Sequence, residues 1–267
     1  AASNFPNDDI GLADLSLGLP TAVQSAENYD DKLLSFFARF NYGFKDKYLF
    51  TASVRADGSS KFGKNNKWGY FPAFSAAWRL GEEEFIKNLN IFSDLKVRLG
   101  YGMAGNNRID SYLSLAVLGS VTYPNGDSTQ PGYVSKQIPN PDLKWEANKT
   151  FNFGLDFGFF NNKLTGAMNY YYNQTEELLI TKALPPSAGL NNPILNVGKI
   201  RNSGVEVEIN WADSKGGFDY NIGMNFSTTK NKVVELADKG QVLYGEGLKY
   251  GTEHFPTQTR VGKPIGA

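Results

Sequence analysis

Residues 34–44 read LSFFARFNYGF, and this stretch decides the fold. Its even positions are all apolar or aromatic, whereas its odd positions include Ser35, Arg39 and Asn41. Successive side chains of a β-strand point to opposite faces, so the pattern predicts a strand with one apolar and one polar face. Only residues 45–47 intervene before the alternation resumes, which indicates a tight hairpin.

The same alternation recurs along the chain and predicts about eight strands. We expect them at residues 34–44, 48–57, 70–80, 94–104, 145–159, 164–173, 204–211 and 218–227. Most approach the roughly 9–11 residues that a tilted strand needs to cross a bilayer, whereas ordinary globular strands average about 5–6. The length of the strands therefore favours a membrane-spanning sheet.

The connections between the expected strands alternate in length. The short ones are residues 45–47, 161–163 and 212–217. The long, polar ones are residues 58–69, 105–144, 174–203 and 228–267. A further connection, 81–93, contains Glu82-Glu83-Glu84 and is expected to hold one helical turn, because negative charge suits a helix N-terminus. Short turns on one rim and long loops on the other are typical of an outer-membrane barrel.

Tryptophan falls at the ends of the expected strands. The apolar positions at these ends include Trp78, Trp145 and Trp211. Amphipathic rings at such positions form girdles at the two membrane interfaces. A soluble β-sandwich with core aromatics is the alternative, but its strands are shorter and its aromatics cluster in mid-strand.

Charged residues follow the polar phase and are the candidate lumen-facing residues. They are Arg39, Arg55, Arg79, Arg98, Asp156, Glu206 and Glu208. An Arg or Lys facing lipid at the bilayer midplane costs about 2–4 kcal/mol, so we expect these side chains to face a wet lumen or a polar plug. Phe37, Leu49 and Phe71 interrupt the polar phase and are expected to pack against something inside. Lys149 interrupts the apolar phase near the loop end of its strand, where the cost is small.

The composition excludes several functions. Lys plus Arg and Asp plus Glu both number 27, so the net charge is zero, and no basic stripe points to nucleic acid. The chain has no cysteine and one histidine, His254, which rules out disulfides, thiol catalysis and His-rich metal sites. No metal or other cofactor is expected. Because His254 lacks a paired nucleophile in any known motif, we do not expect an enzyme.

Two glycine motifs imitate nucleotide-binding sites. Residues 58–64 match most of a phosphate-binding loop, but Asn65 replaces the Ser or Thr that would hold magnesium, and no helix follows. Residues 100–105 match a dinucleotide fingerprint, yet they continue a strand and lead into a loop. Both are better explained as parts of a barrel wall.

Residues 45–63, KDKYLFTASVRADGSSKFG, resemble the SusC/RagA class of TonB-dependent outer-membrane transporters of Bacteroidetes. The resemblance continues through residues 68–72, 76–79, 93–98, 101–106, 140–146, 196–206 and 262–266. These motifs cover most of residues 33–267 in family order, which makes the resemblance specific.

The resemblance implies an all-β fold, namely about eight strands of a 22-stranded transmembrane antiparallel β-barrel in the cell outer membrane. Residues 1–32 would be an extracellular loop segment and residues 33–267 barrel wall, with the plug domain and last strands absent. A SusD-like surface lipoprotein would cover the barrel. The TonB–ExbB–ExbD complex, acting through the absent plug, would drive the import of oligosaccharides or peptides.

Three loop aromatics, Trp68, Tyr123 and Tyr133, are candidates to contact the solute, since aromatic rings stack on sugars. Two other functions stay open from the sequence. One is a barrel adhesin or structural outer-membrane protein without transport, which deletion of the gene would distinguish by unchanged uptake. The other is an outer-membrane hydrolase, which would require His254 for activity.

Overall fold

The computed structural model describes residues 2–3, 19–20, 30–126, 128–182, 184–238, 240–245, 248–250, 252–254 and 257–267. Most of the expected segment 1–32 lies outside these residues, so its assignment to an extracellular loop stays a prediction. Helices are few and short, and none in the described part of the chain is long and apolar enough to cross a membrane.

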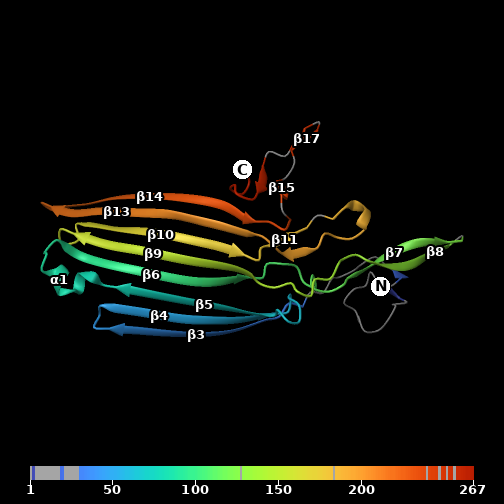
Figure 1. Cartoon of the computed structure of the whole chain (residues 1–267), viewed down its shortest axis with the longest axis horizontal. Coiled ribbons are helices and arrows are strands. Elements are labelled where there is room, and N and C mark those ends of the chain that lie inside the picture. The colour runs from blue at the N-terminus through green and yellow to red at the C-terminus, as the bar shows by residue number, and fades with distance from the viewer. Residues whose placement is uncertain are drawn as a thin grey trace.

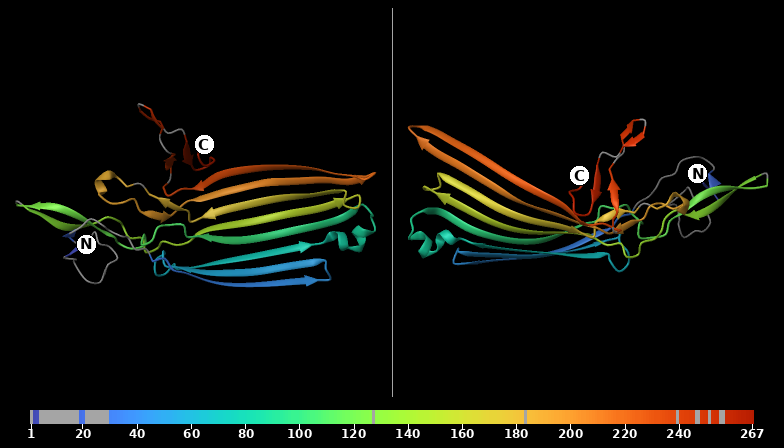
Figure 2. Two further views of the ribbon diagram at one scale, coloured as in Figure 1. Left: turned by 180° about the vertical axis from the view of Figure 1, so that it is seen from behind. Right: turned by 45° about the horizontal axis from the view of Figure 1, so that its top comes forward.

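One antiparallel sheet of eight strands dominates the chain (Figure 1). Its strands are β3 (Leu33–Phe44), β4 (Tyr48–Ser59), β5 (Trp68–Trp78), β6 (Phe92–Asn106), β9 (Glu146–Phe159), β10 (Leu164–Glu176), β13 (Lys199–Lys215) and β14 (Phe218–Glu235). Each pairs with the next of these strands, and β3 and β14 form the two edges. The predicted strands and the all-β fold are confirmed, and Figure 2 shows the sheet as a twisted, curved wall.

Tight turns form one end of the sheet, which we call the short-turn rim. Lys45 and Asp46 have φ of 52° and 53° in the β3–β4 turn, and Gly216 and Gly217 have φ of 61° and 81° between β13 and β14. Positive φ at both central residues gives the hairpin twist that matches paired strands. The β5–β6 connection holds a 3-10 turn, η2 (Leu80–Glu82), and a single helical turn, α1 (Glu84–Lys87), as expected.

Long connections form the opposite end, the long-loop rim, and here the sequence expectation of plain loops was wrong. They contain the small hairpins β7 (Leu118–Asn125) with β8 (Ser128–Ser135), β11 (Leu179–Thr181) with β12 (Ile194–Asn196), β15 (Val242–Tyr244) with β18 (Gln258–Arg260), and β16 (Leu248–Tyr250) with β17 (Thr252–His254). A 3-10 turn, η3 (Pro186–Ala188), and the pair β1 (Ala2–Ser3) and β2 (Leu19–Pro20) complete the elements. The main strands also extend further into this rim than predicted, to Glu176 in β10 and Glu235 in β14.

The tightest packing of the described residues lies at the long-loop rim and not within the sheet. Phe62, Ile109 and Leu143 form a buried cluster, and the Trp145 ring packs against Phe62 at 5.0 Å between centroids. Trp145 lies in the loop before β9, so its predicted place on the apolar phase of a strand was wrong. Its indole Nε1 donates to the Lys67 carbonyl at 3.0 Å, which holds the ring in the loop cluster.

The Trp145 ring also explains why Phe71 interrupts the polar phase of β5. The two rings meet edge to face at 5.4 Å, and Phe71 is buried. Phe71 lies over two glycines: a Cβ added at Gly105 would be 2.0 Å from its ring tip, and one at Gly69 would be 2.5 Å away. Phe71 therefore packs against something inside, as the sequence suggested, and that partner is the loop cluster.

Candidate functional site

Strand register divides the sheet into two continuous faces. Directly paired residues share a face, so Phe74, Tyr101 and Phe151, which pair across β5, β6 and β9, lie on one side. We call this side the apolar face; its most exposed large residues include Phe36, Phe40, Phe74, Ile222, Met224 and Phe226, each at least 56% exposed. The opposite side, the polar face, carries residues such as Ser75, Gly100 and Asn152. In a soluble fold the apolar face would need a covering layer.

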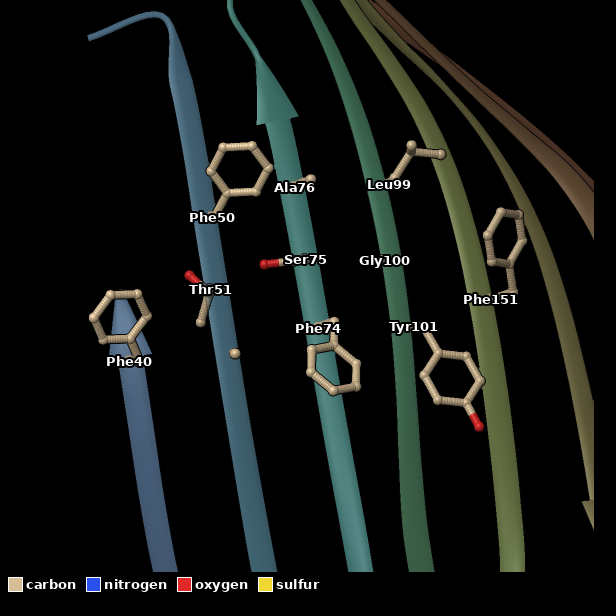
Figure 3. Close-up of a pocket in the computed structure, with 11 residues that line it drawn as sticks. Phe40, Phe50, Thr51, Phe74, Ser75, Ala76, Leu99, Gly100, Tyr101 and Phe151 are labelled. Carbon is tan, nitrogen blue, oxygen red and sulfur yellow. The ribbon is translucent and has the colours of Figure 1, made fainter. Parts of the chain in front are cut away.

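A shallow hollow of about 410 Å³ lies on the apolar face (Figure 3). Large side chains from β3, β4, β5, β6 and β9 surround it, namely Phe40, Phe50, Phe74, Leu99, Tyr101 and Phe151. Ala52 and Ala76 leave the space between them. The lining is almost wholly hydrocarbon, so this surface suits an acyl chain better than a polar ligand.

A charged network occupies the polar face where β6, β9 and β10 meet. The Arg98 guanidinium donates to both carboxylate oxygens of Asp156, at 2.9 and 2.6 Å, and to Asn169 Oδ1 at 3.0 Å. Lys96 Nζ lies 2.9 Å from the same carboxylate. Gly154 makes room for the network, because a Cβ there would lie 2.8 Å from Arg98 Cζ. The bidentate geometry is the strong form of this ion pair.

Beside this network the polar face is hollowed by about 530 Å³. Its lining includes Thr51, Ser75, Arg98, Asn152, Asn169 and Glu206. Glu206 and Glu208 are exposed, and neither has an ion-pair partner among the described residues. Unpaired carboxylates need water or another polar surface, so this face can border an aqueous space or a polar domain.

Two further predicted arginines lie on the polar face near β3. Arg55 Nε donates to Asp57 Oδ1 at 2.8 Å, and the Arg39 guanidinium lies over the Phe37 ring at 5.3 Å. Arg79 is different, because it follows the end of β5. It donates to the Asp46 carbonyl at 3.3 Å and lies at the short-turn rim, apart from the other predicted residues.

The three loop aromatics do not form one binding surface. Trp68 begins β5 on the apolar face and stacks on Phe36 with ring centroids 6.0 Å apart, so its assignment to a loop was wrong. Tyr123 pairs with Gln130 and Tyr133 with Ser120 in the β7–β8 hairpin. This register puts the two tyrosines on opposite faces of the hairpin. Of His254, only the backbone is described, within β17.

Glu83, expected from the sequence only as a charge at a helix N-terminus, has a carboxylate that ties the short-turn rim together. Glu83 accepts hydrogen bonds from Lys47 at 2.8 Å, from Tyr48 at 2.8 Å and from the Trp78 indole at 3.1 Å. These donors, Lys47 first, lower the pKa of Glu83 to about 2, and the same bond raises the pKa of Lys47. The Tyr48 and Trp78 rings stack on the apolar face at 6.0 Å, with their polar tips held at the rim.

Long strands with one hydrocarbon face, one polar face and two different rims define a segment of a transmembrane β-barrel wall. The family model described as TonB dependent receptor-like, beta-barrel, matches residues 2–259, and the chain belongs to this family.

Similar proteins support the SusC/RagA resemblance. TonB-dependent receptor P3 of Formosa agariphila is 35% identical over 267 residues, which is the whole of this chain and 27% of that protein. TonB-dependent receptor SusC of Bacteroides thetaiotaomicron is 38% identical over 223 residues, 80% of this chain and 22% of SusC. A solved structure of the RagAB peptide transporter matches with a TM-score of 0.75 and 30% identity, covering 88% of this chain and 25% of that one. The chain thus spans about a quarter of the length of these relatives.

Proposed function

We propose that this chain forms part of the wall of an outer-membrane importer that takes up oligosaccharides or peptides with energy supplied through TonB. The observation that carries the proposal is the two-faced sheet. Its apolar face exposes rings such as Phe40 and Phe74, while its polar face holds the Arg98–Asp156 network and the unpaired Glu206 and Glu208. A wall between lipid and a wet lumen accounts for both faces at once.

In this proposal the polar face contacts the plug or the passing solute. Arg39, Arg55, Arg98, Asp156, Glu206 and Glu208 are the residues that would do so. Arg79 is left out because it lies past the strand, bonded to the short-turn rim. No residue performs covalent chemistry, and TonB–ExbB–ExbD would supply motion by acting on the plug.

The long-loop rim is the proposed outer side, where a SusD-like lipoprotein would sit as a lid. The alternation of short turns and long connections supports this orientation, because outer-membrane barrels keep short turns on the periplasmic side. The relatives support the transport class: one is SusC, and the structural match is titled a peptide transporter. Both solute classes therefore stay in the proposal.

The proposal is tested by deleting the gene and measuring growth and uptake on single oligosaccharides and peptides, with and without TonB. We expect uptake of one solute to fall in both deletions and to return with the full-length gene. Unchanged uptake of every solute would favour an adhesin or structural barrel instead. Loss of a hydrolytic activity in a His254→Ala variant would favour an enzyme.

A sharper arm of the experiment uses the polar face. The Glu206→Gln/Glu208→Gln variant removes two unpaired charges, and the Lys45→Gln/Lys215→Gln variant removes two exposed charges at the short-turn rim. Only the first should alter uptake at equal protein levels in the outer membrane. Equal effects from both variants would argue against a role of this face in transport.

A further inference from the structure

Charged residues gather on the apolar face at the long-loop rim of β9, β10, β13 and β14. At the short-turn rim, Asp213 and Lys215 of β13 lie on the same face. Register puts Lys149, Gln174, Arg201 and Lys232 in one row across these strands. Ser203 and Lys230 pair in the row below, and Glu176, Lys199 and Glu235 form the row above. We call the cations Lys149, Lys199, Arg201, Lys230 and Lys232, with Glu176 and Glu235, the rim patch. Its cations outnumber its anions, in a chain of zero net charge.

The rim patch is confined to the β9–β14 half of the sheet. At the same rim, β3 and β5 carry exposed apolar or aromatic residues on this face, namely Leu34, Phe36, Trp68 and Tyr70. A rim that was charged only because it emerges into water would show charges on every strand. The cations are instead concentrated on adjacent strands, which is the pattern of a binding surface.

The height of the patch fits the boundary between hydrocarbon and headgroups. Lys149 lies ten residues before the end of β9, and Lys230 lies twelve residues after the start of β14. At about 3.4 Å per residue and a tilt of about 35–45°, these positions lie roughly 24–33 Å above the short-turn rim. The apolar band of such barrels is about 25 Å tall, so the patch begins where that band ends.

Bonds within the patch leave cationic groups free. Glu176 is shared by Lys149, at 2.5 Å, and Lys199, at 3.5 Å. The Arg201 guanidinium lies over the Tyr172 ring at 5.1 Å and gives one bond to Gln174, while its Nε is buried without a partner among the described residues. Lys230 and Lys232 are exposed, with no ion pair in the part of the chain that the structure describes.

We propose that the rim patch binds the phosphate group of a phosphorylated glycolipid in the outer leaflet, an inference that rests on the proposed membrane location. Arg and Lys are the side chains that bind phosphate, and a preoriented guanidinium stacked on a ring does so at little entropic cost. Charge complementarity selects an anionic headgroup over a neutral one. Phe151, two residues nearer the short-turn rim than Lys149 and on the same face, borders the apolar hollow (Figure 3). This hollow offers an apolar surface against which the acyl chains can pack.

The test measures binding of diphosphoryl lipid A, and of the same lipid after enzymatic dephosphorylation, to the full-length transporter purified in neutral detergent. The Arg201→Gln/Lys230→Gln variant should bind the phosphorylated lipid about 30-fold more weakly, at about 1 kcal/mol for each cation. The Lys45→Gln/Lys215→Gln variant, which removes the same charge at the other rim, should bind as the wild type does. Wild type should prefer the phosphorylated lipid, and equal binding of the two lipids would overturn the proposal.

Inorganic phosphate separates a lipid site from a free-anion site. We expect a large excess of phosphate not to displace the lipid, because the acyl chains contribute apolar contact; full displacement would overturn the lipid assignment. Heat-dependent mobility in gels checks that each variant is folded. Lost lipid binding with normal solute uptake supports the patch and leaves the proposed function intact. Failure of the wild-type protein to fractionate with the outer membrane would overturn both.

Discussion

Replacement of Phe153 by arginine is the most direct test of a wall between lipid and water. Phe153 lies on the apolar face of β9, between Leu99 and Tyr170 of the neighbouring strands, and is 43% exposed. It is six residues from the end of β9 at Phe159. At about 3.4 Å per residue and 35–45° of tilt, this is roughly 14–17 Å above the short-turn rim, near the centre of a band about 25 Å tall.

An arginine at this depth should cost about 2–4 kcal/mol relative to Phe153→Ala, the variant that accounts for the lost aromatic surface. The folding equilibrium should therefore shift by roughly 30- to 700-fold. Equilibrium unfolding of the full-length protein in lipid vesicles measures this difference. Asn152→Arg is the matched control, because Asn152 is the adjacent residue on the polar face and lines its hollow. Equal costs for the two arginines would refute the two-faced wall.

Three other predictions concern the wall itself. Gly105→Ala puts a Cβ 2.0 Å from the Phe71 ring tip and should lower the free energy of unfolding by about 1–3 kcal/mol, measured by denaturant titration. A second change, Phe71→Leu, should restore part of that loss. The pKa of Glu83 is lowered to about 2, so its stabilising effect is complete above about pH 4.5 and lost as the pH falls toward 2. Wild-type stability should fall more steeply across that window than that of Glu83→Gln, which keeps the other carboxylates but lacks this one. Asp156→Asn should cost about 1 kcal/mol, because Arg98 is partly exposed, and a double-mutant cycle measures their coupling.

The sequence predicted the middle of each strand correctly, but it stopped β10, β13 and β14 several residues short of their observed ends at the long-loop rim. Alternation is visible in the sequence only where one face of a strand lies against apolar surroundings and the other face lies against polar surroundings. Beyond Tyr172 in β10 and Phe226 in β14, polar residues such as Gln174 and Lys230 stand on the apolar phase, so the two-residue period is lost. Hydrogen bonding to neighbouring strands continues there all the same, and no sequence pattern reports it.

The β7–β8 hairpin was missed for a different reason. Asn125-Gly126 is a hairpin signal, and Gly126 has φ of 62°, but Pro124 and Pro131 lie within the two strands. Proline weakens a strand prediction because it removes a backbone donor, although a two-stranded hairpin has free edges that tolerate this loss. The hairpin pairs with no other strand among the described residues, so no amphipathic pattern was required of it.

The sequence predicted which candidate residues share the polar face, but not which of them contact one another. Period-2 alternation assigned Arg98 and Asp156 to the same phase. Their contact depends on β6 pairing directly with β9, across the connection that holds β7 and β8. Trp145 was expected on the apolar phase of a strand but packs in the loop cluster. A ring at an expected strand end can turn into such a cluster when a partner such as Phe62 is available.

In the proposed importer, the buried loop cluster would bear on how a solute is recognised. Phe62 comes from the β4–β5 connection and Leu143 from the β6–β9 connection, and Ile194 of β12 packs against them. Asn196 exchanges hydrogen bonds with the Lys144 backbone in both directions, at 2.8 and 2.7 Å. Three connections are thus held together by a shared core, and none can move far without exposing apolar surface of the others. A lid docking on this rim would therefore meet a preformed surface, and selectivity would depend on the packing of all three connections together.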